Sequence, residues 1–320
     1  MALIEISQLS VILATGQGPV PVLREVSFAL EAGGTLGLAG ESGSGKSMTV
    51  LALMGLLPEG AQVSGSIRLD GRDLLALAEP EMCRIRGAEM AMIFQEPMTA
   101  LNPLHKIGDQ IGEPLRLHKG FSRAHAMAEA VRLIGRVGLA DPARRAQNYP
   151  HELSGGQRQR AMIAMALACR PRLLIADEPT TALDTTTQAR ILDLVGELVR
   201  EDGLALLLVS HDLGVIAQNV AQLAIMYAGQ IVETGATADV LARPAHPYTR
   251  GLLAARPRLG RSGRLETIAG TAPSPGALPH GCSFAPRCPL ALPACRAAPV
   301  AMVEVGRGHQ ARCLRAGEAP

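Results

Sequence analysis

The chain carries a phosphate-loop pattern, G-x-x-x-x-G-K-S, which requires a buried strand before it and a helix after it. Its residues are Gly40, Glu41, Ser42, Gly43, Ser44, Gly45, Lys46 and Ser47. The glycines let backbone amides turn inward around phosphate oxygens at the positive end of the helix. In such a loop Lys46 reaches the β- and γ-phosphates and Ser47 ligates Mg²⁺. The pattern predicts an α/β fold that binds a nucleoside triphosphate; a Gly/Ser-rich turn without a ligand is the alternative.

The sequence around the loop alternates strands and helices as this fold demands. Ser47 to Leu57 forms a plausible helix directly after the loop. Short apolar segments typical of strands buried on both faces occur at Thr35 to Ala39, Met90 to Phe94, Arg172 to Asp177 and Leu204 to Ser210. These segments predict the strands of a buried α/β sheet.

Two regions depart from this alternation. Before Gly33, strand-like pieces at Leu3 to Leu9 and Val22 to Leu30 are separated by the turn-rich stretch Thr15 to Pro21. They predict an antiparallel β region flanking the nucleotide site. Between residues 95 and 153 the strand signals vanish and segments such as Ser122 to Val137 have helical spacing, so we expect an inserted helical subdomain there.

A pair of carboxylates follows the apolar segment Leu173 to Ala176. A buried strand that stops at Asp177 places this side chain at the carboxyl edge of the sheet, where it can hold the Mg²⁺ shell. Glu178 then points to where a water can attack the γ-phosphate. The alternative is an acidic pair that only caps the following helix.

A second glycine-rich motif, Leu153-Ser154-Gly155-Gly156-Gln157, precedes the helical run Ala161 to Cys169. Two glycines after a serine at a helix start create another nest of amides that can receive an anion. A glycine-rich helix cap without a ligand is the alternative, and for this motif taken alone it is the better one.

Composition excludes several classes of protein. The 31 Lys and Arg balance 29 Asp and Glu without a long basic run, so a dedicated nucleic-acid surface is not expected. The chain is 48% hydrophobic, but its apolar stretches are far shorter than the roughly 20 residues that cross a bilayer. The N-terminal residues 1–10 lack a basic lead-in and a cleavage site, which favours a cytoplasmic protein.

Taken together, the motifs resemble an ATP-binding cassette (ABC) ATPase over residues 1–240. The resemblance is carried by residues 40–47, Gln95, residues 153–157 and 173–178, Ala182-Leu183-Asp184 and His211, in the expected order. It implies a P-loop ABC-type ATPase with a RecA-like core, an antiparallel β subdomain and a helical subdomain at about residues 96–165. It also implies ATP and Mg²⁺ as ligands.

The resemblance assigns roles to single residues. Gln95 senses Mg²⁺ and the attacking water, Glu178 polarises that water, and His211 contacts the γ-phosphate. Asp184 belongs to the loop that communicates across a dimer. The remaining implied nucleotide contacts are Met48 beside the phosphate loop and, toward the ATP of an opposite subunit, Ser154, Gly155, Gly156 and Gln157. The implied Mg²⁺ ligands are Ser47, Gln95 and Asp177.

One position departs from the family pattern. ABC ATPases usually offer an aromatic residue upstream of the phosphate loop to stack on adenine, and the corresponding place here is Leu13. Leucine can still cover the ring by apolar contact, so we expect weaker base selectivity rather than loss of activity.

Residues 241–320 form a Cys/Pro-rich C-terminal extension. Of the chain's 22 prolines, 11 lie from Pro244 onward, so we expect no regular sheet or long helix there, and a disordered tail is one interpretation. The stretch His246 to Leu253 and the segment Phe94 to Pro103 resemble ATPases of peptide, opine and nickel importers. Together with Ala52 to Leu57, the segment Phe94 to Pro103 is most similar to the D-type subunit of dipeptide and oligopeptide permeases.

Four of the six cysteines lie in this extension with the spacing C-x5-C-x6-C-x17-C; they are Cys282, Cys288, Cys295 and Cys313. In a reducing cytosol clustered thiols favour a metal over disulfides. The spacing lacks the C-x2-C pairs of structural zinc, and the resemblance implies a [4Fe-4S] cluster. Zinc and no metal at all remain as alternatives.

The resemblance also implies partners. A peptide-importer ATPase works as a dimer with a second ABC ATPase subunit, identical or different. It acts on two transmembrane permease subunits, which receive solute from an extracytoplasmic binding protein, and it lies peripherally on the cytoplasmic face of the inner membrane. Nickel or opine uptake, a soluble ABC protein acting on nucleic acid or ribosomes, and a cassette that binds ATP without hydrolysing it are the alternatives.

Overall fold

The computed structural model describes residues 2–16, 18–180, 184–255 and 267–316. The chain divides into two compact units. The first comprises residues 1–3, 30–34 and 76–208, and the second comprises residues 4–29, 35–75 and 209–320. Of the predicted site residues, the phosphate loop, His211 and the four clustered cysteines belong to the second unit. Gln95, Asp177, Glu178, Asp184 and the motif Leu153 to Gln157 belong to the first.

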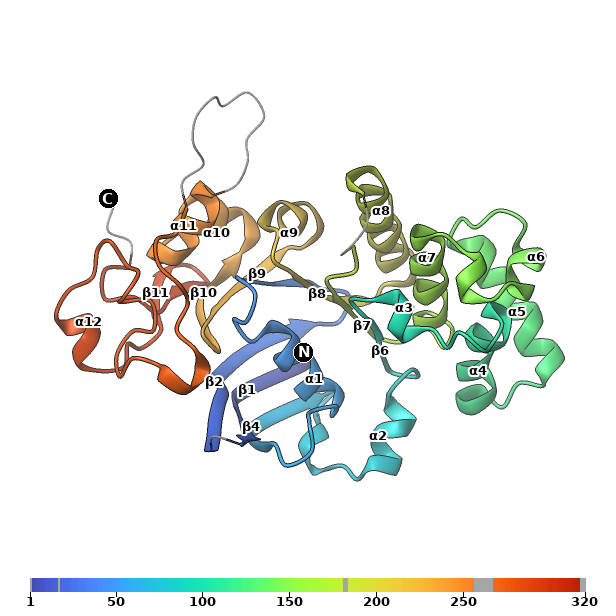
Figure 1. The fold of residues 1–320 in the computed structure, drawn as a ribbon, viewed down its shortest axis with the longest axis horizontal. Coiled ribbons are helices and arrows are strands. Elements are labelled where there is room, and N and C mark those ends of the chain that lie inside the picture. The colour runs from blue at the N-terminus through green and yellow to red at the C-terminus, as the bar shows by residue number, and fades with distance from the viewer. Residues whose placement is uncertain (1, 17, 181–183, 256–266, 317–320) are drawn as a thin grey trace. The chain divides into compact units, whose positions relative to one another are not determined.

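Most of an antiparallel sheet lies in the second unit, as expected. Its order is β2-β1-β4-β5, built from β1 (Ala2–Thr15), β2 (Gly18–Glu31), β4 (Gln62–Leu69) and β5 (Arg72–Asp73). Figure 1 shows β1, β2 and β4 side by side in blue. The connection between β1 and β2 is shorter than the predicted turn at Thr15 to Pro21, because Gly18 to Pro21 belong to β2. Pro19 and Pro21 are tolerated because β2 is an edge strand.

A mixed sheet supports the phosphate loop in the same unit. Parallel pairing joins β3 (Thr35–Ala39) to β9 (Gln222–Tyr227), and antiparallel pairing continues through β10 (Gln230–Ala236). The phosphate loop leads from β3 into α1 (Lys46–Met54), and α9 (Leu213–Asn219) packs on β3. Gly37 allows this close approach, because a Cβ there would lie 2.6 Å from a methyl carbon of Ile216.

The C-terminal region is ordered into short elements, which corrects the expectation that it forms no regular sheet. Strand β12 (His309–Ala311) pairs with β10, and β11 (Val303–Gly306) pairs with β12, both antiparallel. Neither strand contains a proline, because the prolines lie in the loops and at helix starts. The helices here are α10 (Thr237–Ala242), α11 (Pro247–Ala254), α12 (Ala294–Ala297) and the 3-10 turn η3 (Pro275–Ala277).

The first unit combines buried parallel strands with helices. Its strands β6 (Met90–Ile93) and β7 (Leu173–Asp177) pair in parallel and are fully buried. Strand β8 (Ala205–Ser210) begins in this unit, and the amide of Ala205 donates to the carbonyl of Arg172. These strands match the predicted ones to within one residue at each end. The short helix α2 (Glu79–Ile85) and the 3-10 turn η1 (Leu74–Ala76) precede β6.

The predicted helical region between residues 95 and 153 contains only helices and loops, all of them described. Its helices are α3 (Pro97–Ala100), α4 (Ile107–Lys119), α5 (Arg123–Arg136), α6 (Pro142–Gln147) and the 3-10 turn η2 (Pro150–Glu152). They pack beside α7 (Gly155–Ala166), which contacts α8 (Thr185–Asp202) (Figure 1). Within the described ranges, no helix has the length and apolar character needed to span a membrane.

Candidate nucleotide-binding site

The phosphate loop has a backbone that only glycine can adopt at its first position. Gly40 has φ 153°, and a Cβ there would lie 2.2 Å from the carbonyl oxygen of Met226. Gly43 and Gly45 also have positive φ, and Gly45 is the N-cap of α1. The loop is therefore wrapped tightly against β9, with its amides leading into the helix N-terminus.

Lys46 is buried inside this loop and hydrogen-bonded to its backbone. Its ammonium Nζ donates to the carbonyl oxygens of Gly40 at 2.8 Å and Glu41 at 3.0 Å, and the residue is only 5% exposed. The Oγ of Ser44 is buried and, among the described residues, has no hydrogen-bond partner. A phosphate oxygen would satisfy such a hydroxyl, because buried polar groups almost always find partners.

The remaining loop residues are accessible to a ligand. Ser42, Gly43 and Ser47 are exposed, whereas Met48 is half-buried. Leu13, expected to cover adenine, is half-buried on β1 in the same unit. These placements suit nucleotide contacts, and the roles of Met48 and Leu13 stay predictions.

In the first unit, the structure brings Gln95 and Glu178 together. The side-chain amide Nε2 of Gln95 donates to Oε2 of Glu178 at 3.1 Å. Asp177 is 5% exposed and is the last residue of β7, so its carboxylate lies at the carboxyl end of this strand, as predicted. Glu178 has φ 45°, a left-handed backbone that is unfavourable for a non-glycine residue and clusters at functional sites.

The motif at residues 153–157 forms the start of α7. Ser154 is the N-cap: its Oγ accepts from the Gln157 amide, and its own amide donates to Oε1 of Gln157, which makes a reciprocal capping box. Ser154 and Gly155 are exposed, and a Cβ on Gly156 would lie 2.9 Å from the Thr187 methyl carbon. The cap is satisfied internally, and its glycines leave the helix end open to an outside ligand.

Asp184 and His211 lie at element ends. Asp184 is the exposed N-cap of α8, and hydrogen bonds from Thr187 and Thr186 lower the pKa of its carboxyl. His211 directly follows β8 and is exposed. Ala182 and Leu183, predicted as part of the same loop as Asp184, lie outside the described residues.

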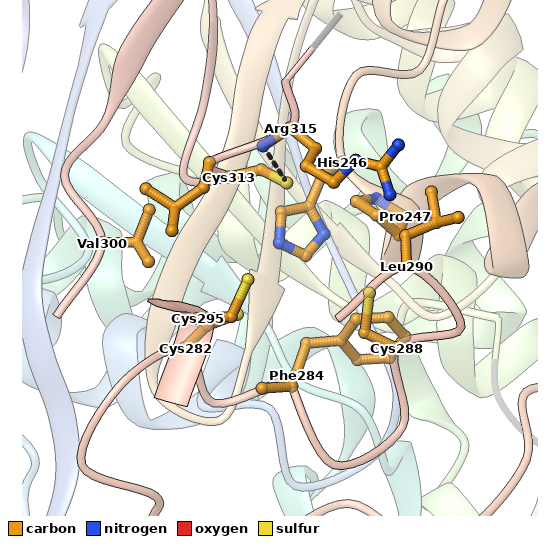
Figure 2. Close-up of a pocket in the computed structure, with 12 residues that line it drawn as sticks. His246, Pro247, Cys282, Phe284, Cys288, Leu290, Cys295, Val300, Cys313 and Arg315 are labelled. Carbon is orange, nitrogen blue, oxygen red and sulfur yellow. Dashed lines mark hydrogen bonds between the residues drawn. The ribbon is translucent and has the colours of Figure 1, made fainter. Parts of the chain in front are cut away.

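The four clustered cysteines line one small cavity of about 20 Å³ in the second unit. Figure 2 shows the thiols of Cys288, Cys295 and Cys313 directed toward the space beside the His246 ring. Burial raises the pKa of the Cys282, Cys288 and Cys313 thiols. The backbone amides of Leu292 and Arg315 donate to the sulfurs of Cys295 and Cys313. All four cysteines are free.

His246 and Arg315 are further polar residues that line this cavity. Burial lowers the pKa of His246 to about 3, so the ring is neutral at physiological pH. Its Nδ1 accepts from the Tyr248 amide at 3.0 Å, which places the ring proton on Nε2. That Nε2 is buried and lacks a partner among the described residues. Across those residues, no three His, Cys, Asp or Glu side chains are arranged to hold a metal ion.

Sequence reasoning missed a set of residues that surrounds Glu41 of the phosphate loop. Arg287, Tyr248, Tyr227 and Phe284 pack together, and the first two bond to Glu41. Arg287 immediately precedes Cys288, and Tyr248 lies in the His246 to Leu253 stretch quoted above. The sequence analysis therefore named segments that contain or adjoin these two residues. No sequence signal indicated that they contact a loop more than 200 residues away.

Comparison with known proteins decides the family. The family model described as "ABC transporter" matches residues 23–181, and the one described as "Oligopeptide/dipeptide transporter, C-terminal region" matches residues 232–295. The oligopeptide transport ATP-binding protein OppD of Salmonella typhimurium is 50% identical over 298 residues, covering 93% of this chain and 89% of OppD. The chain belongs to the ABC transporter family.

Other ABC proteins give the same result. OppD of Escherichia coli is 49% identical, with 93% of this chain and 89% of that protein covered. Among solved structures, a dimer of the ATP-binding cassette MJ0796 in a post-hydrolysis state with ADP and Pi has a TM-score of 0.66 at 27% identity. The match covers 73% of this ABC chain and 98% of the cassette. The P-loop ABC fold expected from the motifs is confirmed.

Proposed function

We propose that the chain is the ATP-hydrolysing, energy-coupling subunit of an ABC importer for dipeptides and oligopeptides. The contact between Gln95 and Glu178 after β6 and β7 carries the enzymatic part, because it joins the proposed water sensor to the proposed base. The peptide part rests on the similarity to OppD and to the oligopeptide/dipeptide C-terminal model.

Hydrolysis proceeds by in-line attack of water on the γ-phosphate. Glu178 accepts a proton from this water and Gln95 helps to orient it, while Lys46 and His211 stabilise charge on the phosphate oxygens. Ser47, Asp177 and Gln95 would hold Mg²⁺, which neutralises charge on the triphosphate. Reaction depends on positioning and charge neutralisation and needs no covalent intermediate.

A second ATPase subunit, identical or related, completes the site. Ser154 is the N-cap of α7, Gly155 is its first residue, and both are exposed. The Ser154 side chain satisfies only part of the backbone amides at this helix end, so the end suits the phosphate of an ATP held by a partner subunit. Asp184 lies at the start of α8 and would communicate between the subunits. The dimeric state of the MJ0796 cassette supports this arrangement.

Two permease subunits receive the resulting motion through the helical region at residues 96–153. The ATPase would lie peripherally on the cytoplasmic face of the membrane, and a separate binding protein would deliver peptide to the permeases. ATP closes the dimer and hydrolysis reopens it. The permeases and the binding protein set selectivity among peptides.

We also propose that Cys282, Cys288, Cys295 and Cys313 hold a [4Fe-4S] cluster. The donor types suit the group, because four thiols line one cavity, although the described side chains are not arranged to hold a metal in this structure. Two of the sulfurs accept backbone amides, and the Nε2–H of His246 could donate to a sulfur. The bound cluster would cross-link the loops of this region, and its role is structural. Zinc on the same thiols is the second candidate.

Reconstitution tests the transport function. The full chain is expressed with the permeases and the binding protein from its genetic neighbourhood and assembled in vesicles. Uptake of a labelled tripeptide should require ATP on the side of this chain and should stop with Lys46→Ala. Uptake of nickel or an opine without peptide uptake would contradict the substrate assignment, whereas ATP-independent uptake would contradict the energy-coupling role.

A further inference from the structure

Glu41, the second residue of the phosphate loop, is held from three sides. Its carboxylate receives two hydrogen bonds from the Arg287 guanidinium, at 2.7 Å from Nη1 and 3.1 Å from Nη2. Its backbone amide donates to the Tyr248 hydroxyl at 2.8 Å. Its carbonyl accepts from Lys46 Nζ at 3.0 Å. One residue thus joins the C-terminal region to the lysine that reaches the phosphates.

Arg287 is built into its position rather than drawn to it from solvent. Its side chain is 6% exposed, and Nε and Nη2 also donate to the carbonyls of Ala269 and Ile268. The guanidinium carbon lies 5.8 Å from the Tyr227 ring centre and 6.0 Å from that of Phe284. The bonds to Glu41 are the largest cause of its raised pKa, so it stays charged. A bidentate pair between this buried guanidinium and the half-buried Glu41 carboxylate has a fixed geometry.

Tyr248 is equally rigid. It is fully buried and packs against Tyr227 and Phe284 with ring centres 4.6 Å and 5.4 Å apart. Two of the chain's three tyrosines and one of its four phenylalanines gather in this cluster. The chain has few other aromatic residues, so a large share of them packs beside a single residue of the phosphate loop, Glu41.

The negative charge of Glu41 explains why Arg287 contacts this residue. A carboxylate in a loop that receives a triphosphate repels the negative charge of its ligand. Arg287 neutralises that carboxylate and fixes its direction. Tyr248 fixes the peptide whose carbonyl Lys46 contacts. If either contact is lost, Glu41 can move, and the rest position of Lys46 moves with it.

We propose that Arg287 and Tyr248 are positioning residues for ATP: acting through Glu41, they neutralise and orient the phosphate loop, so ATP affinity depends on the packing of the C-terminal region. This inference rests on the proposed ATPase function. Arg287 directly precedes Cys288, and Tyr248 follows His246 by two residues. The cysteine cavity and the phosphate loop are therefore joined through neighbouring residues of one region.

A charge cycle tests the proposal by equilibrium binding of a fluorescent N-methylanthraniloyl derivative of ATP with Mg²⁺ to the full chain. Arg287→Met should weaken binding about tenfold, because it leaves the Glu41 carboxylate uncompensated. Glu41→Gln in the same protein should restore most of the loss, since the repelling charge is gone. Arg287→Lys should lie between wild type and Arg287→Met, and Tyr248→Phe should weaken binding by about threefold to tenfold.

Hydrogen exchange without nucleotide gives a readout that does not depend on ATP. Peptides covering residues 40–47 should exchange faster in Arg287→Met and Tyr248→Phe than in wild type. Arg243→Ala, which removes an exposed ion pair with Asp239 on α10, is the matched control and should leave both exchange and binding unchanged. A loss in Arg287→Met that is merely added to that of Glu41→Gln would overturn the proposal. So would unchanged exchange at residues 40–47.

The two readouts also separate this inference from the function on which it rests. If wild type does not bind the ATP derivative, the proposed ATPase function is wrong, and exchange at residues 40–47 still decides whether Arg287 holds the loop. If wild type binds it and Arg287→Met binds equally well with unchanged exchange, the ATPase function stands and the positioning role is wrong.

Discussion

The side-chain amide of Gln95 lies 3.1 Å from the carboxylate of Glu178, although 83 residues separate them in the chain. The pairing of β6 with β7 produces this contact, because parallel strands bring their carboxyl ends to the same edge. The bond holds the Glu178 carboxylate in one direction despite its unfavourable backbone conformation. A base that must face one water molecule benefits from such preorganisation.

Glu178→Gln should therefore bind ATP normally and hydrolyse it at least about 100-fold more slowly, since a general base contributes roughly 10²–10⁴ in rate. The substitution keeps the shape and hydrogen-bonding capacity of the side chain but removes its basicity. Filter binding of labelled ATP and phosphate release measure the two properties. Hydrolysis at the wild-type rate would show that Glu178 is not the base.

Gly40→Ala should abolish ATP binding and destabilise the fold by about 1–3 kcal/mol, as overpacking does. The added Cβ would lie 2.2 Å from the Met226 carbonyl oxygen, a backbone atom that cannot move aside easily, and φ 153° disfavours alanine. Gly276→Ala, where a Cβ meets nothing within 4 Å, is the control and should melt like wild type. Equal melting temperatures and ATP affinities for both variants would contradict the tight wrapping of the loop.

The local patterns of the sequence predicted the strands and the phosphate loop well, because both depend on nearby residues. Apolar runs bounded by polar residues specify buried strands such as β7, and glycine spacing specifies the loop. The C-terminal region was predicted less well. Prolines exclude regular structure only where they stand, so the short strands β11 and β12 form in the gaps between them.

Contacts between distant segments were not predictable in this way. The bond between Arg287 and Glu41 spans 246 residues, and no periodicity encodes it. The resemblance to a family supplied Gln95 and His211, whose residue types alone are common on protein surfaces. The phosphate loop could thus be predicted from its local sequence, whereas the contacts between residues far apart in the chain could not.

Ser154→Arg should leave ATP binding by the single subunit unchanged and stop hydrolysis. The position is exposed at the start of α7, so a large cation there blocks the end that would meet a partner's ATP without disturbing the core. Mixing this variant with Glu178→Gln, and measuring dimers with ATP by light scattering, checks the effect. Full dimerisation and hydrolysis by Ser154→Arg would refute a role for this helix end in the assembly.

Cys288→Ser should lose most of the bound iron and sulfide and the visible absorption of the anaerobically purified protein. One thiolate of the four would be missing, and the loops of residues 281–316 should become sensitive to protease. Cys83→Ser, an exposed cysteine on α2, is the control and should keep its iron. One equivalent of zinc in wild type, without visible absorption, would replace the iron–sulfur assignment by zinc.

For the proposed [4Fe-4S] cluster, His246→Phe should retain the iron but shift the reduction potential to a lower value. A hydrogen bond to sulfur stabilises the reduced, more negative state, and phenylalanine fills the buried space of the imidazole without offering Nε2–H. Redox titration monitored by electron paramagnetic resonance measures the shift, and iron content shows whether the cluster is still present. An unchanged potential in a fully loaded variant would mean that the unpaired Nε2–H does not face the cluster, and loss of iron would instead make His246 necessary for holding it.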